Sequence, residues 1–173
     1  MAISNKDRIS RTLDLLRDGL VPFVERELKA KLGSSWLKAV DDSLREDLRR
    51  RADGSIAWDT QGLFTVMDKW WGDVFRFPLG RMERSYVNEL RETRNDFAHE
   101  KTTFTYEDTE RALDTAQRLL RAVSAGEQAD AIERLRVDLK RTIYDEQRRQ
   151  QVRRQSTLTL EGTPKAGLCP GAR

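Results

Sequence analysis

The apolar positions of this chain follow a helical period from its first residues. Between about 5 and 32 they recur three or four residues apart, which gathers them on one face of an α-helix. Ser4 or Asn5 is a suitable cap for this helix, Gly33 follows its end, and Pro22 marks a kink or break within it. The apolar residues on this face are Ile9, Leu13, Leu16, Leu20, Phe23, Val24 and Leu28.

The same periodicity predicts further helices along the chain, separated by short stretches rich in Gly, Pro, Ser and Asp. Charged residues make up 35% of the chain and aromatic residues 8%, with only four prolines and ten glycines, which favours helices over a sheet protein. We therefore predict an all-α fold, a bundle of about five to six helices with a long C-terminal helix and a flexible tail. The further helices are expected at about 36–51, 60–75, 81–99, 106–124 and 127–155.

The helix expected over 81–99 carries two stripes of side chains. Its apolar stripe is predicted to face the core and consists of Met82, Tyr86, Leu90, Thr93 and Phe97. At about 100° per residue, a second stripe points away from Phe97. That stripe consists of Asn88, Arg91, Asn95 and His99. We therefore expect His99 to point outward, with the side chain of Asn95 one turn away and able to bond to its ring.

His99 is the only histidine in the 173 residues. An unperturbed imidazole titrates near neutral pH, so acid–base chemistry in this chain would pass through His99. The alternative is that His99 only caps the helix end, where it would interact with the last carbonyls. For Arg94 the alternative is a surface ion pair with Glu92 or Glu100.

The hexapeptide R-N-D-F-A-H, residues 94–99, resembles the signature of the HEPN superfamily. In that signature an Arg is followed by a polar residue, and a His comes four to six residues after the Arg. The Trp-rich segment upstream and the opening helix also resemble the HEPN subgroup named for a eukaryotic nuclear mRNA-surveillance endoribonuclease. The resemblance covers residues 5–125 approximately.

This resemblance implies a HEPN-like helical bundle and a metal-independent endoribonuclease that acts as a homodimer on RNA. It implies that Arg94 and His99 meet their counterparts across a two-fold axis, with Asn95 in support. Arg91 and Lys101 flank these residues and are candidate substrate-binding residues. The resemblance also implies a role in phage defence or as a toxin, with a defence-system protein or a fused ATPase domain as partner.

A second reading of the same residues involves no catalysis. The chain would then be a HEPN-like dimerisation or interaction module, the N-terminal part of a larger defence protein. The outward stripe that ends at His99 would form a dimer interface or a docking surface. This reading predicts that changes at Arg94 and His99 alter association without any turnover of RNA.

The composition also indicates the expected location of the protein and whether it binds a metal ion or a cofactor. No apolar run approaches the roughly 18 residues of a membrane span, and the N-terminus lacks the apolar segment of a signal peptide, so we expect a cytoplasmic protein with no membrane contact. The single cysteine, Cys169, excludes an internal disulfide and a Cys-based metal site. We find no phosphate-binding glycine loop and no zinc-ligand spacing, and we expect neither a metal ion nor a cofactor.

The predicted organisation is a helical domain over 1–125, a long basic helix over 126–155 and a tail or linker over 156–173. The net charge of +3 is too small to indicate a partner, but basic residues cluster in the long helix. These residues are Arg134, Arg136, Lys140, Arg141, Arg148, Arg149, Arg153 and Arg154. They could hold a phosphate backbone, or they could form a solvated helix face or a dimer contact.

The four tryptophans lie at positions 36, 58, 70 and 71. Aromatic side chains at helical spacing generally belong to a core. The alternative is that one partly exposed tryptophan stacks on an unpaired base.

Overall fold

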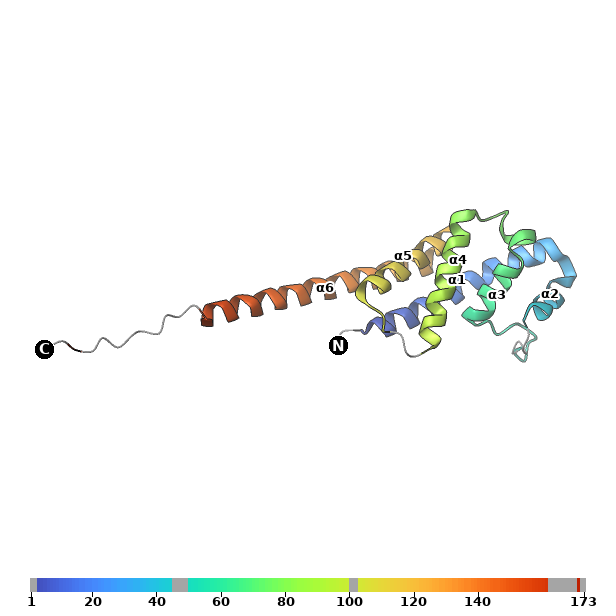
Figure 1. Cartoon of the computed structure of the whole chain (residues 1–173). Coiled ribbons are helices and arrows are strands. Elements are labelled where there is room, and N and C mark those ends of the chain that lie inside the picture. Colours follow the sequence, from blue (N-terminus) through green and yellow to red (C-terminus); the bar gives the residue numbers. More distant parts are fainter. Residues whose placement is uncertain (1–2, 45–49, 100–102, 162–170, 172–173) are drawn as a thin grey trace. The chain divides into compact units, whose positions relative to one another are not determined.

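The computed structural model of the chain describes residues 3–44, 50–99, 103–161 and 171. Within these ranges it contains helices and no strand, which confirms the predicted all-α class (Figure 1). The chain divides into two compact units, Met1–Leu139 and Lys140–Arg173, and each is described separately. The helices are α1 (Asn5–Leu32), α2 (Trp36–Ser43), α3 (Thr60–Lys69), α4 (Arg81–Ala98), α5 (Tyr106–Ala122) and α6 (Gly126–Glu161).

Helix α1 is the central helix of the first unit and contacts α2, α3, α4 and α5. Its start is fixed by a capping box, in which the Ser4 hydroxyl accepts the backbone N–H of Asp7 at 3.0 Å and the Asp7 carboxylate bonds back to Ser4. Its end is set by Gly33, whose φ of 58° suits glycine. The sequence predicts a kink or a break at Pro22, and of these two the break is wrong, because α1 continues through Pro22.

Helices α1 and α5 approach closely at Gly19. A Cβ atom at this position would lie 2.5 Å from Leu120 Cδ2 and 3.0 Å from Ala125 Cβ, so only glycine fits without a shift. The core beside this contact is filled by fully buried side chains from both helices. They include Ile9, Leu16, Leu20, Leu113, Leu119 and Leu120.

The second and third predicted helices end earlier than their spacing indicates. Helix α2 ends at Ser43, Leu44 is extended, and residues 45–49 lie outside the described ranges. Helix α3 ends at Lys69 and is followed by η2 (Trp71–Phe75), a π-helical turn. A π turn holds one more residue than an α turn, so it shifts the register of the apolar positions and a helical pattern does not reveal it.

Two of the four tryptophans belong to the core, as the aromatic spacing predicts. Trp58 and Trp71 are buried, whereas Trp36 and Trp70 are half-buried. The indole N–H of Trp58 donates to Glu25 at 2.9 Å, and that of Trp70 donates to the Ser43 hydroxyl at 2.9 Å. Both contacts occur between helices or segments that are distant in the chain.

The buried side of α4 differs from the predicted stripe. Val87 and Leu90 are buried, whereas Met82 is 61% exposed. On a helix Met82 lies about 110° away from the direction midway between Val87 and Leu90, so it cannot share their side. The helix is therefore rotated from the predicted orientation, and Asn88, Arg91 and Asn95 are half-buried rather than fully outward.

The beginning of α6 belongs to the first unit. Ala129, Ile132 and Leu139 are buried there, and the buried guanidinium of Arg8 on α1 pairs with Asp138 at 2.8 Å. The buried guanidinium of Arg8 needs a counter-charge, which Asp138 supplies although its own side chain stays 44% exposed. This pair therefore fixes the start of α6 against α1.

The second unit continues α6 as far as Glu161, beyond the predicted end at Gln155. Residues 156–161, assigned to a tail by composition, are therefore helical, whereas Cys169 lies outside the described ranges. The helix in this unit is largely solvent-exposed, including its large apolar side chains Tyr144, Val152 and Leu158. None of the helices in the described ranges is sufficiently long and apolar to cross a bilayer.

Candidate functional site

The C-terminal end of α4 presents the histidine of the motif. Ala98 is the last helical residue, and His99 occupies the cap position with φ −85° and ψ 23°. Its backbone N–H donates to the Asn95 carbonyl oxygen at 3.1 Å. Among the described residues no bond joins the two side chains, so the predicted bond between the Asn95 side chain and the His99 ring is not formed in this structure. The ring of His99 is exposed, as the helical spacing predicts.

Arg94 lies one turn beyond the buried Leu90 and is half-buried. Residues four positions apart share a side of the helix, so the stem of Arg94 follows the packed side of α4. In the ranges that the structure describes, no carboxylate pairs with its guanidinium. Glu92 is among the described residues and Glu100 is not. Among the described residues, therefore, no carboxylate has to be displaced before the Arg94 guanidinium binds an anion.

Arg91, expected to bind substrate, is paired in the structure. Its Nη1 lies 3.2 Å from Asp68 Oδ2 on α3, and the two side chains are 38% and 43% exposed. An ion pair this exposed contributes little to stability, so it can open without a large cost. Lys101, the other candidate substrate-binding residue, lies outside the described ranges and stays a prediction.

The first turn of α1 brings a further cation to this end of α4. Lys6 Nζ lies 5.8 Å from the centre of the Phe97 ring, two residues before His99. The Asn5 side chain donates to the Phe104 carbonyl oxygen at 3.0 Å and ties the segment before α5 to the same turn. No spacing in the sequence could reveal Lys6, because tertiary packing alone brings it near the motif.

The side of α4 that faces α5 is acidic. A hollow of about 350 Å³ there is lined by four carboxylates and a single guanidinium, which disfavours a phosphate. The Arg111 guanidinium donates to Glu89 at 2.8 Å, and this bond lowers the pKa of the Glu89 carboxyl. The lining residues are Glu89, Glu92, Thr93, Asp96, Phe104, Asp108, Arg111 and Ala112. In the described part of the chain no three His, Cys, Asp or Glu side chains are grouped as metal ligands.

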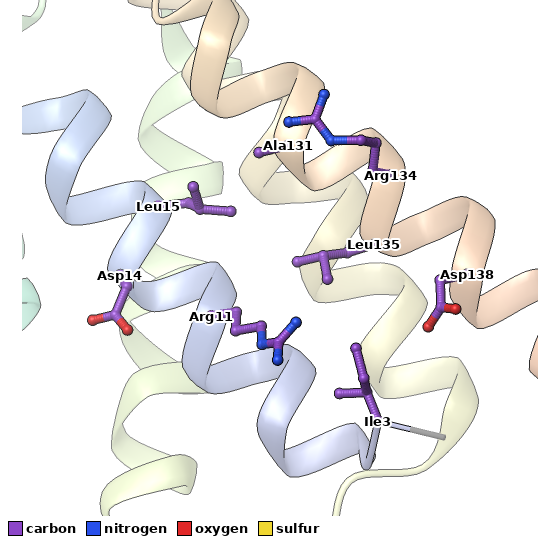
Figure 2. A pocket seen from close by; sticks show the side chains of 8 residues that line it. All are labelled: Ile3, Arg11, Asp14, Leu15, Ala131, Arg134, Leu135 and Asp138. Atoms are coloured by element: carbon purple, nitrogen blue, oxygen red, sulfur yellow. The ribbon is translucent and has the colours of Figure 1, made fainter. Parts of the chain in front are cut away.

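A larger groove lies between α1 and the first part of α6 and is separate from the motif (Figure 2). It measures about 530 Å³, and Leu15 and Leu135 point into it from its two helices. Neither Arg94 nor His99 lines it, and its two arginines are matched by two aspartates. The lining residues are Ile3, Arg11, Asp14, Leu15, Ala131, Arg134, Leu135 and Asp138.

The helices that hold the motif also carry the sequence pattern of a known family. The model of the Swt1-like HEPN family matches residues 11–124, a span that includes most of α1, all of α2 to α5 and the motif. The chain belongs to the Swt1-like HEPN family. The resemblance drawn from the hexapeptide is thereby confirmed, and it places the chain in a superfamily of nucleases and RNA-binding domains. No curated protein matches the chain, and no solved structure matches it either.

Proposed function

We propose that this HEPN protein is a metal-independent endoribonuclease that acts as a homodimer. The observation that carries the proposal is the arrangement at the end of α4, where a family-typical Arg and His occur together. His99 is exposed to substrate, and Arg94 has no carboxylate partner among the described residues. Lys6 adds a positive charge beside Phe97.

The proposed chemistry uses a nucleophile that belongs to the RNA. The 2′-hydroxyl oxygen attacks the adjacent phosphorus while His99 takes the hydroxyl proton as general base. The bond from phosphorus to the 5′ oxygen breaks, and this leaving oxygen receives a proton from the imidazolium of His99 of the partner subunit. The products carry a 2′,3′-cyclic phosphate and a 5′-hydroxyl. Each chain has one histidine, and a dimer in which two chains share a site would provide both the base and the acid, which is why the proposal includes the dimer.

Arg94 is proposed to bind the phosphate that reacts. A guanidinium is planar and permanently charged, so it can donate two bonds to phosphate oxygens and stabilise the charge that develops on them. Asn95 is proposed to hold His99 or a phosphate oxygen. Arg91 and Lys101 are proposed to contact neighbouring phosphates, and Arg91 would exchange its exposed pair with Asp68 for such a contact.

Incubation with RNA in the presence of EDTA tests this proposal. Wild type is expected to cleave RNA and to leave the matching DNA uncut, because DNA lacks the 2′-hydroxyl. The fragments are expected to end in 2′,3′-cyclic phosphate. Arg94→Ala is expected to lose activity while it keeps its helical circular dichroism spectrum. Fragments that end in a 5′-phosphate, or equal cleavage of DNA, would contradict the proposed mechanism.

A non-catalytic interaction module is the second candidate function. It is favoured by the exposed position of His99 at the end of α4, a helix that also lines a hollow in which four of the eight lining residues are acidic. For this function, Arg94→Ala and His99→Ala would change the oligomeric state measured by light scattering, and no RNA would be cleaved by wild type. The incubation with RNA described above, with analysis of the fragment ends, separates the two functions.

The biological setting that we propose is phage defence or toxicity, and family membership is its only support. Expression of the wild-type chain in bacteria is then expected to arrest growth, whereas the His99→Ala chain should be tolerated at the same level. Equal growth of the two strains at equal protein levels would contradict a toxic nuclease.

A further inference from the structure

An exposed aromatic ring surrounded by cations lies at the other end of α4. Phe77, in the turn between η2 and α4, is 63% exposed. Lys31 Nζ lies 5.0 Å from the centre of its ring, and Arg76 Cζ lies 4.8 Å from it. In the first turn of α4, Arg84 Cζ lies 5.8 Å from the ring of Trp71. Because only Lys31 and Arg76 contact the Phe77 ring, we call Lys31, Arg76 and Phe77 the Phe77 patch.

The Phe77 patch is poorly explained by stability alone. A large apolar side chain gains little from folding when most of its surface stays in water. The turn that carries it is held by other residues, since Leu79 is buried and its N–H donates to the Phe75 carbonyl oxygen at 3.0 Å. The exposed ring of Phe77 is therefore available to a ligand.

The charges of the patch specify the kind of ligand. Within the described ranges no carboxylate pairs with Lys31 or Arg76, and the Glu83 carboxylate accepts the Gly80 N–H at 2.8 Å. Unpaired cations around an aromatic ring match a strand whose phosphates are negative and whose bases have flat faces. Cation–π contacts at exposed sites are weaker than base stacking on an aromatic ring, so a base can displace them.

From these observations we infer that the Phe77 patch binds single-stranded RNA, with Phe77 stacking on an unpaired base and Lys31 and Arg76 contacting phosphates. The inference rests on the proposed function, because it names a second contact of the same substrate. Helix α4 has 18 residues and is about 27 Å long, so the patch and His99 contact different nucleotides. Phe77 is thus a binding residue and takes no part in the chemistry.

The inference is tested by binding to a labelled oligouridylate with 2′-O-methyl riboses, which lacks a free 2′-hydroxyl and cannot be cleaved by the proposed reaction. Fluorescence anisotropy is expected to show that Phe77→Ala raises Kd about tenfold, the range typical of one lost stacking contact. Phe77→Tyr should bind as wild type, since it keeps an aromatic face. Phe77→Leu should bind as weakly as the alanine variant, although it stays apolar.

The control is Met82→Ala, which removes an apolar side chain of similar exposure, 61%, from the first turn of α4. It is expected to leave Kd unchanged. Lys31→Ala and Arg76→Ala should each reduce the slope of log Kd against log salt by about one. An unchanged Kd for Phe77→Ala, or wild-type binding by Phe77→Leu, would overturn the inference and favour a protein ligand for this surface.

Cleavage assays separate the failure of this inference from failure of the nuclease. With a cleavable RNA, Phe77→Ala is expected to raise KM and to leave kcat unchanged, because the lost contact is equal in the ground and transition states. Binding that depends on Phe77 without any cleavage would support the patch and contradict the nuclease. Cleavage that depends on His99 with a wild-type KM for Phe77→Ala would support the nuclease and overturn the patch.

Discussion

Two regions of the first unit surround arginine in opposite ways. Between α5 and α6, Arg136 is 18% exposed and lies 2.9 Å from Glu110 and 3.0 Å from Asp114, and it donates to the Gln117 side-chain oxygen at 2.6 Å. At the end of α4, Arg94 has no carboxylate partner among the described residues. The first guanidinium is surrounded by the groups that a guanidinium needs, so its function is structural. The second is free of carboxylates in the described ranges, in keeping with the phosphate-binding role that we propose for it.

The same difference recurs at the Phe77 patch, where cations contact aromatic rings instead of carboxylates. A charge that is buried between two helices needs a counter-charge, because an unpaired charge out of water is costly. A basic side chain binds a phosphate more tightly when no carboxylate pairs with it, because the carboxylate would compete with the phosphate. The partners of a basic residue therefore indicate its function more directly than its position in the sequence does.

The largest expected effect is on stability at Arg136. Arg136→Ala removes the ion pairs that Arg136 makes with Glu110 and Asp114, and Asp114 keeps only its pair with Arg118, so we expect a loss of about 3 kcal/mol in the free energy of unfolding. The matched Arg94→Ala variant is expected to lose under about 0.5 kcal/mol. Urea denaturation of both variants measures this. Similar losses for the two variants would remove the distinction between the two regions.

A smaller effect is expected where α1 meets α5. Gly19→Ala forces a Cβ atom to within 2.5 Å of Leu120 Cδ2, and overpacking of this kind costs about 1–2 kcal/mol. Gly72→Ala is the control, because no heavy atom lies within 4 Å of the Cβ position there. Thermal unfolding should show a lower Tm for Gly19→Ala alone. A Tm equal to that of the control would mean that the helices separate freely at this contact.

The smallest effect concerns Glu89 on the acidic side of α4. The bond from Arg111 lowers the pKa of Glu89, so the folded state favours the carboxylate, and the added stability is fully present above the ordinary glutamate pKa of about 4.3. This added stability is lost as the pH falls from the ordinary glutamate pKa through the lower pKa that Glu89 has in the folded protein. Glu89→Gln should therefore destabilise the protein at neutral pH by under about 1 kcal/mol, because the pair is partly exposed.

This prediction for Glu89 is checked by measuring, as a function of pH, the difference in unfolding free energy between wild type and Glu89→Gln. Urea denaturation of wild type and Glu89→Gln is expected to show a gap in unfolding free energy at pH 7 that narrows in acid. Glu92→Gln serves as control, since Glu92 is exposed on the same helix. A gap that stays constant through acid pH would show that the Arg111 bond does not depend on the charge of Glu89.

Local signals in the sequence predicted the helices that position the motif. The capping box at Ser4 and Asp7 starts α1 at the predicted residue, and Thr105 with Asp108 starts α5 in the same way. Each signal lies within one turn of the residues it controls. The motif itself was also recognisable, because its Arg, Asn and His lie on one helix at fixed spacing.

Tertiary contacts were not predictable from those signals. Helical spacing assigned Met82 to the core, and Asp68 on α3 was not foreseen as the partner of Arg91. Lys6 reaches Phe97, and Lys31 reaches Phe77, only after distant helices pack. The period of a helix fixes how its own side chains are arranged around its axis, whereas the neighbouring helices decide which of those side chains are buried.

The most direct test of the central claim is the rate of RNA cleavage by His99→Ala. Because His99 is exposed at a helix end, its removal should leave thermal unfolding nearly unchanged. A His99→Ala homodimer loses both the general base and the general acid, and the loss of either should lower the rate by about 10²- to 10⁴-fold. Cleavage at the wild-type rate by a correctly folded His99→Ala protein would contradict the proposed mechanism.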